Sequence, residues 1–155
     1  MSELPKDAAR IISDERPRIM RYSYSAGSVR SKFLLCLRDQ EKILGTRCPS
    51  CGKVYVPARS TCFECFENIE EWVEVSHEGL LETYTIVYKS EPVHTVDTPI
   101  AFGIVKLDGA DTSIVHKLGE IDFKKIRIGM RVRAVFNEER KGGILDIKYF
   151  KPTNV

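Results

Sequence analysis

The sequence of 155 residues lacks several features that define common classes of protein. It has no apolar run near the roughly 18 residues that a membrane-spanning helix needs, so we expect a soluble protein without a membrane partner. The first ten residues lack the basic-then-apolar pattern of a secretory signal, and we therefore expect a reducing, cytoplasmic location. Nucleophile-elbow, phosphate-loop and His-Glu-x-x-His motifs are also missing, and the three histidines are scattered. These absences predict that the chain is not an enzyme.

The chain also has little net charge, +2 in total, but this charge is unevenly distributed. Residues 1–47 hold ten basic and six acidic side chains, residues 48–123 hold five and thirteen, and residues 124–155 hold nine and three. A protein that coats nucleic acid seldom has so acidic a middle segment, so we do not expect nucleic acid as the main partner. The basic C-terminal segment suits a small phosphorylated ligand, an acidic partner surface, or the solvated faces of a charge-balanced fold.

Four of the five cysteines form two Cys-x-x-Cys pairs, which are Cys48 with Cys51 and Cys62 with Cys65. Two such pairs joined by a short loop are typical of a tetrahedral four-thiolate metal site. Zinc is the expected ion and iron the alternative, because an all-sulfur tetrahedron accepts either. A closed site of this kind has no open coordination position, so we predict a structural role. Gly52 suits a left-handed turn after the first pair, whereas Phe66 after the second pair predicts a less regular knuckle.

Two helices are predicted before the cysteines, a short one at residues 5–12 and a longer one from Ser25 to Leu44 that Gly45 ends. Apolar residues recur at helical spacing along the longer helix. Its apolar face packs either on the chain's own core or on another protein. We select Val29, Phe33 and Leu37 as candidate partner-binding residues. The fifth cysteine, Cys36, lies in the same apolar run and is expected to behave as a small buried hydrophobe.

Period-two alternation after the ribbon predicts five strands, at residues 80–88, 100–107, 112–118, 130–136 and 144–150. In the first strand we expect Leu81, Thr83, Thr85 and Val87 to share one face. Five strands with the main interruption between the third and fourth are the layout of an OB-fold. The predicted fold is therefore mainly β with N-terminal helices, a rubredoxin-like zinc ribbon and a five-stranded OB-fold barrel. The expected domains are a helical segment at 1–45, the ribbon at 46–70 and the OB-fold at 71–155.

Several motifs are shared with a known family. They are Arg47-Cys48-x-x-Cys51-Gly52, Tyr55-x-Pro57-Ala58-Arg59, Cys62-x-x-Cys65, Gly79-x-x-x-Thr83-Tyr84-Thr85, Pro99, Leu107-Asp108-Gly109 and Ile128-Gly129-Met130-Arg131-Val132. With these motifs the chain resembles the zinc-ribbon/OB-fold proteins associated with acyl-CoA metabolism, which are common in archaea and catalogued as a domain of unknown function. It departs from the family pattern at Ala58, where a second proline is usual, and at Phe66, where glycine is usual.

The resemblance implies a non-catalytic partner of thiolase-fold enzymes. Archaeal relatives bridge acetoacetyl-CoA thiolase and hydroxymethylglutaryl-CoA (HMG-CoA) synthase in the mevalonate pathway, and such a role implies acyl-CoA binding. Candidate ligand contacts for the phosphates are Arg59, Lys106, Arg131 and Arg133, and those for an apolar groove are Tyr84 and Phe102. Two alternatives remain open, a single-stranded nucleic-acid-binding OB-fold module and an iron-containing electron carrier.

Overall fold

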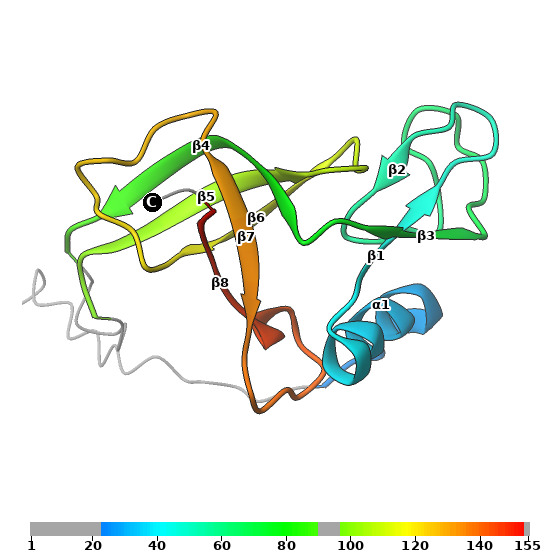
Figure 1. The fold of residues 1–155 in the computed structure, drawn as a ribbon. Coiled ribbons are helices and arrows are strands. Elements are labelled where there is room, and N and C mark those ends of the chain that lie inside the picture. The colour runs from blue at the N-terminus through cyan, green and yellow to red at the C-terminus, as the bar shows by residue number, and fades with distance from the viewer. Residues whose placement is uncertain (1–22, 90–96, 154–155) are drawn as a thin grey trace, which may run out of the picture.

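The computed structural model describes residues 23–89 and 97–153, so the helix expected at residues 5–12 lies outside the described residues. The elements in chain order are α1 (Gly27–Gln40), β1 (Ile43–Arg47), β2 (Val54–Tyr55), β3 (Glu71–Val75), β4 (Glu78–Val87), β5 (Ile100–Leu107), β6 (Ser113–Leu118), β7 (Arg131–Phe136), the 3-10 turn η1 (Ile144–Asp146) and β8 (Ile147–Pro152). Figure 1 shows a small sheet, β2-β1-β3, at one end, a barrel at the other, and α1 close to their junction. Within the described ranges, no helix has both the length and the apolar character of a membrane span.

Helix α1 ends earlier than the sequence predicts. It stops at Gln40, because Glu41 adopts a left-handed conformation with φ of 56° and its N–H bonds to the carbonyl of Cys36. Leu44, the predicted last residue, belongs instead to β1 and lies opposite Glu74 of β3. The apolar spacing of the helix continues into this strand, so periodicity alone could not locate the boundary.

Gly45 has a different role from the predicted helix end. It lies inside β1, where an added Cβ would come within 2.8 Å of Val54 Cγ1 and 3.0 Å of the Tyr55 carbonyl oxygen. The close approach of β1 to β2 therefore requires glycine at this position.

The apolar face of α1 packs on the chain's own core. Phe33 is 2% exposed and Leu37 is fully buried, and both join a core cluster that continues through Ile43 into the barrel. The structure therefore corrects the prediction that these two residues face a partner. Val29, the third candidate, is half-buried in the first turns of the helix.

The barrel is closed in the order β4-β5-β6-β8-β7, which confirms the predicted five-stranded OB-fold. Strand β4 closes it by pairing with β5 along its length and with β7 at its start. Strands β6 and β8 meet in parallel where Leu118 lies opposite Phe150. The fifth strand begins later than predicted, because residues 144–146 form the 3-10 turn η1.

A β-bulge in β4 changes which residues face the barrel interior. The register shifts between Leu81 and Thr83, so that Tyr84 lies opposite Gly103. A Cβ on Gly103 would contact Leu81 Cδ1, so Gly103 and Tyr84 share the inward face with Leu81. The prediction that Thr83, Thr85 and Val87 continue the face of Leu81 is therefore wrong. The extra residue of a bulge reverses the alternation, and a strict period-two pattern does not anticipate it.

The turn between β5 and β6 joins the barrel to the ribbon. The Val54 N–H donates to Asp111 Oδ2 at 2.8 Å, and the Asp111 N–H donates to the Val54 carbonyl at 2.9 Å. The Thr112 hydroxyl accepts from the Val56 N–H at 2.8 Å and donates to the Val56 carbonyl at 2.9 Å. Because these bonds satisfy the edge of β2, they fix the ribbon against the barrel.

Arg140, in the loop between β7 and β8, holds the end of α1. Its Nε donates to the Arg38 carbonyl and its Nη1 to Glu41 Oε1, each at 2.7 Å. A guanidinium at a helix C-terminus pairs with carbonyls that have no partner inside the helix.

Replacing Thr112 with valine should destabilise the fold. Valine has the shape of threonine but leaves the Val56 N–H and carbonyl without their partner, so we expect a loss of about 1–3 kcal/mol in the free energy of unfolding. Urea unfolding of Thr112→Val measures this, with Thr85→Val, an exposed position on β4, as the matched control. Equal stability of the two variants would show that this contact does not hold the ribbon in place.

Candidate functional site

The four paired cysteines lie on two knuckles with the same backbone geometry. In the first, the Cys48 N–H bonds to the Lys53 carbonyl and the Gly52 N–H to the Cys48 carbonyl. In the second, residues 62–67, the equivalent bonds join Cys62 to Glu67 and Phe66 to Cys62. Phe66 reaches this geometry with φ of 59°, close to the 73° of Gly52. The prediction of a less regular second knuckle is therefore wrong, because phenylalanine adopts the conformation usual for glycine.

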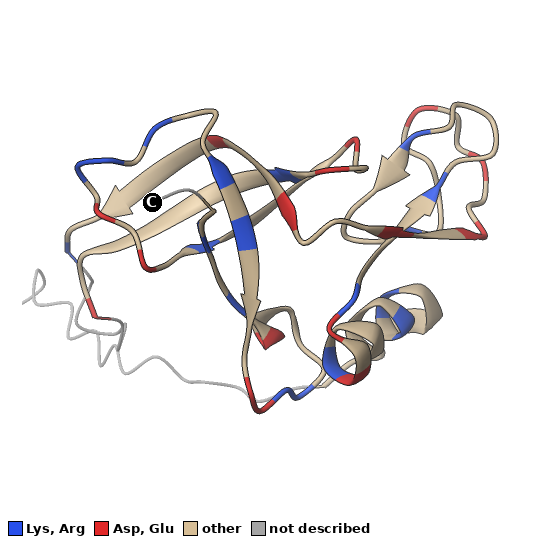
Figure 2. Ribbon diagram, viewed as in Figure 1, with Lys and Arg blue, Asp and Glu red and all other residues tan. Residues whose placement is uncertain are grey.

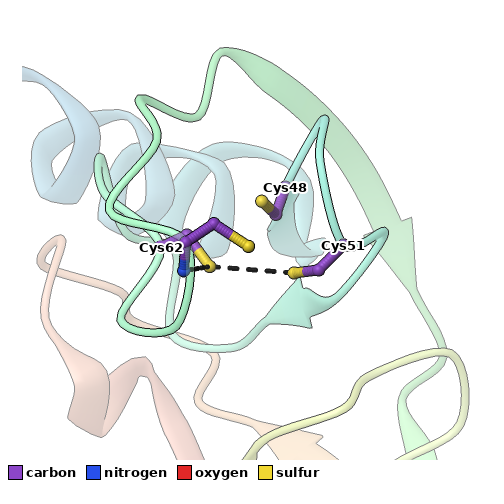
Figure 3. Close-up of side chains that lie close together, drawn as sticks. Cys48, Cys51 and Cys62 are labelled. Carbon is purple, nitrogen blue, oxygen red and sulfur yellow. Dashed lines mark hydrogen bonds between the residues drawn. The ribbon is translucent and has the colours of Figure 1, made fainter.

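The four sulfurs form a compact cluster. Their Sγ atoms all lie within 4.8 Å of one another, and the Sγ atoms of Cys51 and Cys62 are 3.7 Å apart. Zinc bound tetrahedrally at a Zn–S distance of about 2.3 Å separates its sulfurs by about 3.8 Å, so the donor set fits such an ion. Figure 3 shows the side chains of Cys48, Cys51 and Cys62 turned toward one another from the two knuckles. Cys36 lies on α1 and is not part of this cluster.

The hydrogen-bond donors around the Cys62 sulfur favour its thiolate form. Its Sγ lies 3.1 Å from the Tyr55 hydroxyl and 3.4 Å from the backbone nitrogen of Cys65. Burial raises the pKa of the Cys62 thiol, but hydrogen bonds from the Tyr55 hydroxyl and from backbone N–H groups outweigh burial and lower the pKa to about 6. The same contact with Cys62, together with burial, raises the pKa of Tyr55 well above its usual value, so this hydroxyl stays a donor. A thiolate at Cys62 leaves no proton to displace there, whereas the hydrogen bond with Cys51 and burial raise the pKa of Cys65 to about 12, so a metal ion still displaces the proton of Cys65.

The candidate ligand contacts lie in three separate places. Phe102, Lys106, Arg131 and Arg133 lie on the outer face of the barrel, Tyr84 on the inward face, and Arg59 in the ribbon. Arg131 is engaged by Asp108 through two bonds of 2.8 and 2.6 Å, and by Glu78 at 3.4 Å. These bonds to Asp108 hold the pKa of the Arg131 guanidinium above its usual value and that of the Asp108 carboxyl below. Among the described residues, Lys106 and Arg133 form no ion pair and are the more accessible cations of this face.

Arg59 and Val29 meet at one pocket. A pocket of about 510 Å³ lies between the start of α1, residues 26–30, and the ribbon segment 58–61. The backbone of Arg59 is fixed there, because its N–H and carbonyl both bond to the buried Thr46 hydroxyl at 2.9 Å. Arg30 and Arg59 both line the pocket, and both are exposed.

Sequence reasoning missed three residues that shape these sites. Tyr55 bonds to a metal-ligating sulfur, and Asp111 and Thr112 fix the edge of β2. Asp111 and Thr112 act on a strand more than fifty residues away, and no local pattern signals such a contact. Tyr55 carries a weak signal, since it alternates with Val54 and Val56 in a short apolar run next to the first cysteine pair.

Comparison with known families identifies both parts of the chain. Residues 37–70 match the description "ChsH2, rubredoxin-like zinc ribbon domain", and residues 72–137 match "ChsH2, C-terminal OB-fold domain". The chain belongs to the ChsH2-type zinc-ribbon/OB-fold family. This membership confirms the resemblance seen in the sequence.

Two curated relatives of this chain are named "DUF35 domain-containing scaffold protein". The one from Methanocaldococcus jannaschii is 29% identical over 75% of this chain and 85% of its own length. The one from Methanothermobacter thermautotrophicus is 28% identical over 71% of this chain and 86% of its own length. The relatives that carry the scaffold name are therefore similar to this chain over most of their length.

Two solved structures share the fold. A DUF35 family protein of unknown function from Sulfolobus solfataricus matches with a TM-score of 0.59 and 26% identity, covering 74% of this chain and 81% of that protein. A chain of the Ltp2-ChsH2(DUF35) aldolase matches with a TM-score of 0.61 and 23% identity, covering 83% of this chain and 98% of the other. At this identity the second match shows the fold alone.

Removal of one ligand should release the metal. We expect one zinc ion per chain in the wild-type protein, and a loss of tight zinc binding in Cys62→Ser, because three thiolates and a hydroxyl do not complete the tetrahedron. Elemental analysis after dialysis against a mild chelator measures the bound zinc and distinguishes it from iron. Cys36→Ser is the matched control and should keep its metal. Full metal content in Cys62→Ser would contradict the four-thiolate site.

Proposed function

We propose that this chain is a non-catalytic scaffold subunit that associates with thiolase-fold enzymes and helps to pass an acyl-CoA intermediate between them. The observation that carries the proposal is the similarity to curated proteins named as scaffolds, over most of the length of both chains. The fold shared with a chain of the Ltp2-ChsH2(DUF35) aldolase also supports association with an enzyme. A closed four-thiolate site supports a structural role for the metal, because it leaves no position for a substrate.

The proposed enzymes are acetoacetyl-CoA thiolase and HMG-CoA synthase, acting in the mevalonate pathway in the cytoplasm. Thiolase condensation is unfavourable, so rapid consumption of its product draws the reaction forward. A scaffold that holds both active sites close together raises the effective concentration of the intermediate at the second site. The contacts that fix the ribbon against the barrel suit this role, because they keep two docking surfaces at a constant separation.

We place the nucleotide end of acyl-CoA in the pocket beside Arg59. Its volume of about 510 Å³ lies within the range of roughly 300–1,000 Å³ typical of ligand sites. Arg30 and Arg59 can pair with the phosphates of CoA in bidentate fashion. Arg131 is a weaker candidate, because Asp108 and Glu78 already occupy its guanidinium.

Co-purification of the tagged chain from its native cells tests the proposed function. We expect a thiolase and an HMG-CoA synthase to remain bound through moderate salt, in amounts comparable to the chain. Mass spectrometry identifies the bound proteins, and an unrelated tagged protein is the control. Recovery of nucleic acid with ribosomal or replication proteins would instead favour the single-stranded nucleic-acid-binding alternative.

Charge reversal in the pocket should weaken CoA binding. We expect Arg59→Glu to weaken the binding of acetyl-CoA by about tenfold or more, because a charge-assisted bond to phosphate is replaced by repulsion. Titration calorimetry on the purified complex measures the affinity. Arg133→Glu, an equal change at an exposed cation of the barrel, is the matched control. A loss in Arg133→Glu alone would move the site to the outer face of the barrel.

A further inference from the structure

Phe66 is an exposed aromatic residue in a conformation that suits glycine. Its side chain is 80% exposed, and its φ is 59°. Gly52 occupies the equivalent position of the first knuckle, and an added Cβ there would meet no atom within 4 Å, so the backbone angle is what favours glycine. A side chain is disfavoured at such an angle, and an exposed ring gains nothing from burial. The folding of this chain alone therefore favours glycine at position 66.

Phe63 places a second aromatic ring on the same knuckle. It is 53% exposed and lies edge-on against the Tyr55 ring, with the ring centres 5.5 Å apart. Because Tyr55 is fully buried and bonded to Cys62, the Phe63 ring is held in place by the metal site. Rigid, partly exposed aromatic rings are favourable anchors at protein interfaces, because little side-chain freedom is lost on binding.

Acidic residues predominate around these rings, although Lys53 Nζ lies 5.9 Å from the centre of the Phe63 ring. Glu64, Glu67 and Glu70 lie in or next to the knuckle, and Figure 2 shows several acidic segments beside two basic segments at this end of the ribbon. Glu64 pairs with Lys53, whereas Glu67 and Glu70 form no ion pair within the described residues. A partner surface with basic side chains would complement this charge and steer association.

We propose that the second knuckle, residues 62–67, is a docking element that inserts Phe66 into an apolar pocket bordered by Lys and Arg side chains on a partner protein. The identification of that partner as a thiolase-fold enzyme rests on the proposed function. The contact with the partner accounts for phenylalanine at a position where the fold favours glycine.

Substitutions at position 66 separate docking from folding. We expect Phe66→Gly to unfold at the same temperature as the wild type or higher, while its affinity for the co-purifying enzyme falls about tenfold or more. Phe66→Trp, which keeps a large aromatic ring, should retain binding. Leu145→Asn, at another apolar residue that is 74% exposed, is the control and should bind normally. A photo-cross-linking phenylalanine analogue at position 66 should join the chain to a peptide that lines the basic-bordered pocket.

Three outcomes would overturn the docking proposal. These are unchanged partner affinity in Phe66→Gly, a clearly lower unfolding temperature in that variant, or a wild-type homodimer in sedimentation that the variant loses. Unchanged affinity would show that Phe66 does not contact the partner, and a lower unfolding temperature would show that Phe66 stabilises the fold. Loss of a homodimer would show that Phe66 binds a second copy of this chain. Failure of the proposed function would give a different result from failure of the docking proposal. Position 66 would then cross-link to a partner whose binding depends on Phe66 but which is not a thiolase-fold enzyme.

Discussion

The hydrogen bonds between the β5–β6 turn and the edge of β2 are the constraint on which the rest of the structure depends. Strand β2 has only two residues, and one of its edges is not paired with another strand. Asp111 and Thr112 hydrogen-bond to the backbone along this edge, in the place that a neighbouring strand would take. The apolar core then continues without a break from α1 through the ribbon sheet into the barrel. Ribbon and barrel therefore form one body, and surfaces on the two ends keep a fixed separation.

The knuckles are the part of this body that the shared core does not support. Their own buried cluster is small, consisting of Cys48, Tyr55, Cys62 and Ile69 with Cys65 packed against it. So few apolar side chains supply little stability, and coordination of a metal ion by the four thiolates is the natural source of the rest. The ribbon thus depends on two kinds of interaction, apolar packing at the end near the barrel and metal coordination at the tip.

The sequence predicts the parts of this structure that depend on local patterns. The spacing of the cysteines identifies the metal cluster, and the alternation in residues 100–107 matches β5 in full. The predictions fail where a distant contact or an inserted residue decides the outcome. Leu44 pairs with β3 and is therefore part of a strand. The bulge after Leu81 places Thr83 on the outer face, and Phe33 is buried in the core. None of these effects leaves a signal within a short window of sequence.

The acidic and basic side chains are unevenly distributed over this body. Acidic residues predominate on the second knuckle and β3, whereas the barrel carries basic residues on β7 and the loop before it together with acidic residues elsewhere (Figure 2). Because the ribbon and the barrel are rigidly joined, the attraction of each charged region for an oppositely charged partner also sets the orientation of that partner. A body that orients two different partners at a fixed separation meets the geometric requirement of a scaffold, since the effective concentration of one partner near the other depends on that separation. Neither a flexible linker between ribbon and barrel nor a uniform surface charge would provide this.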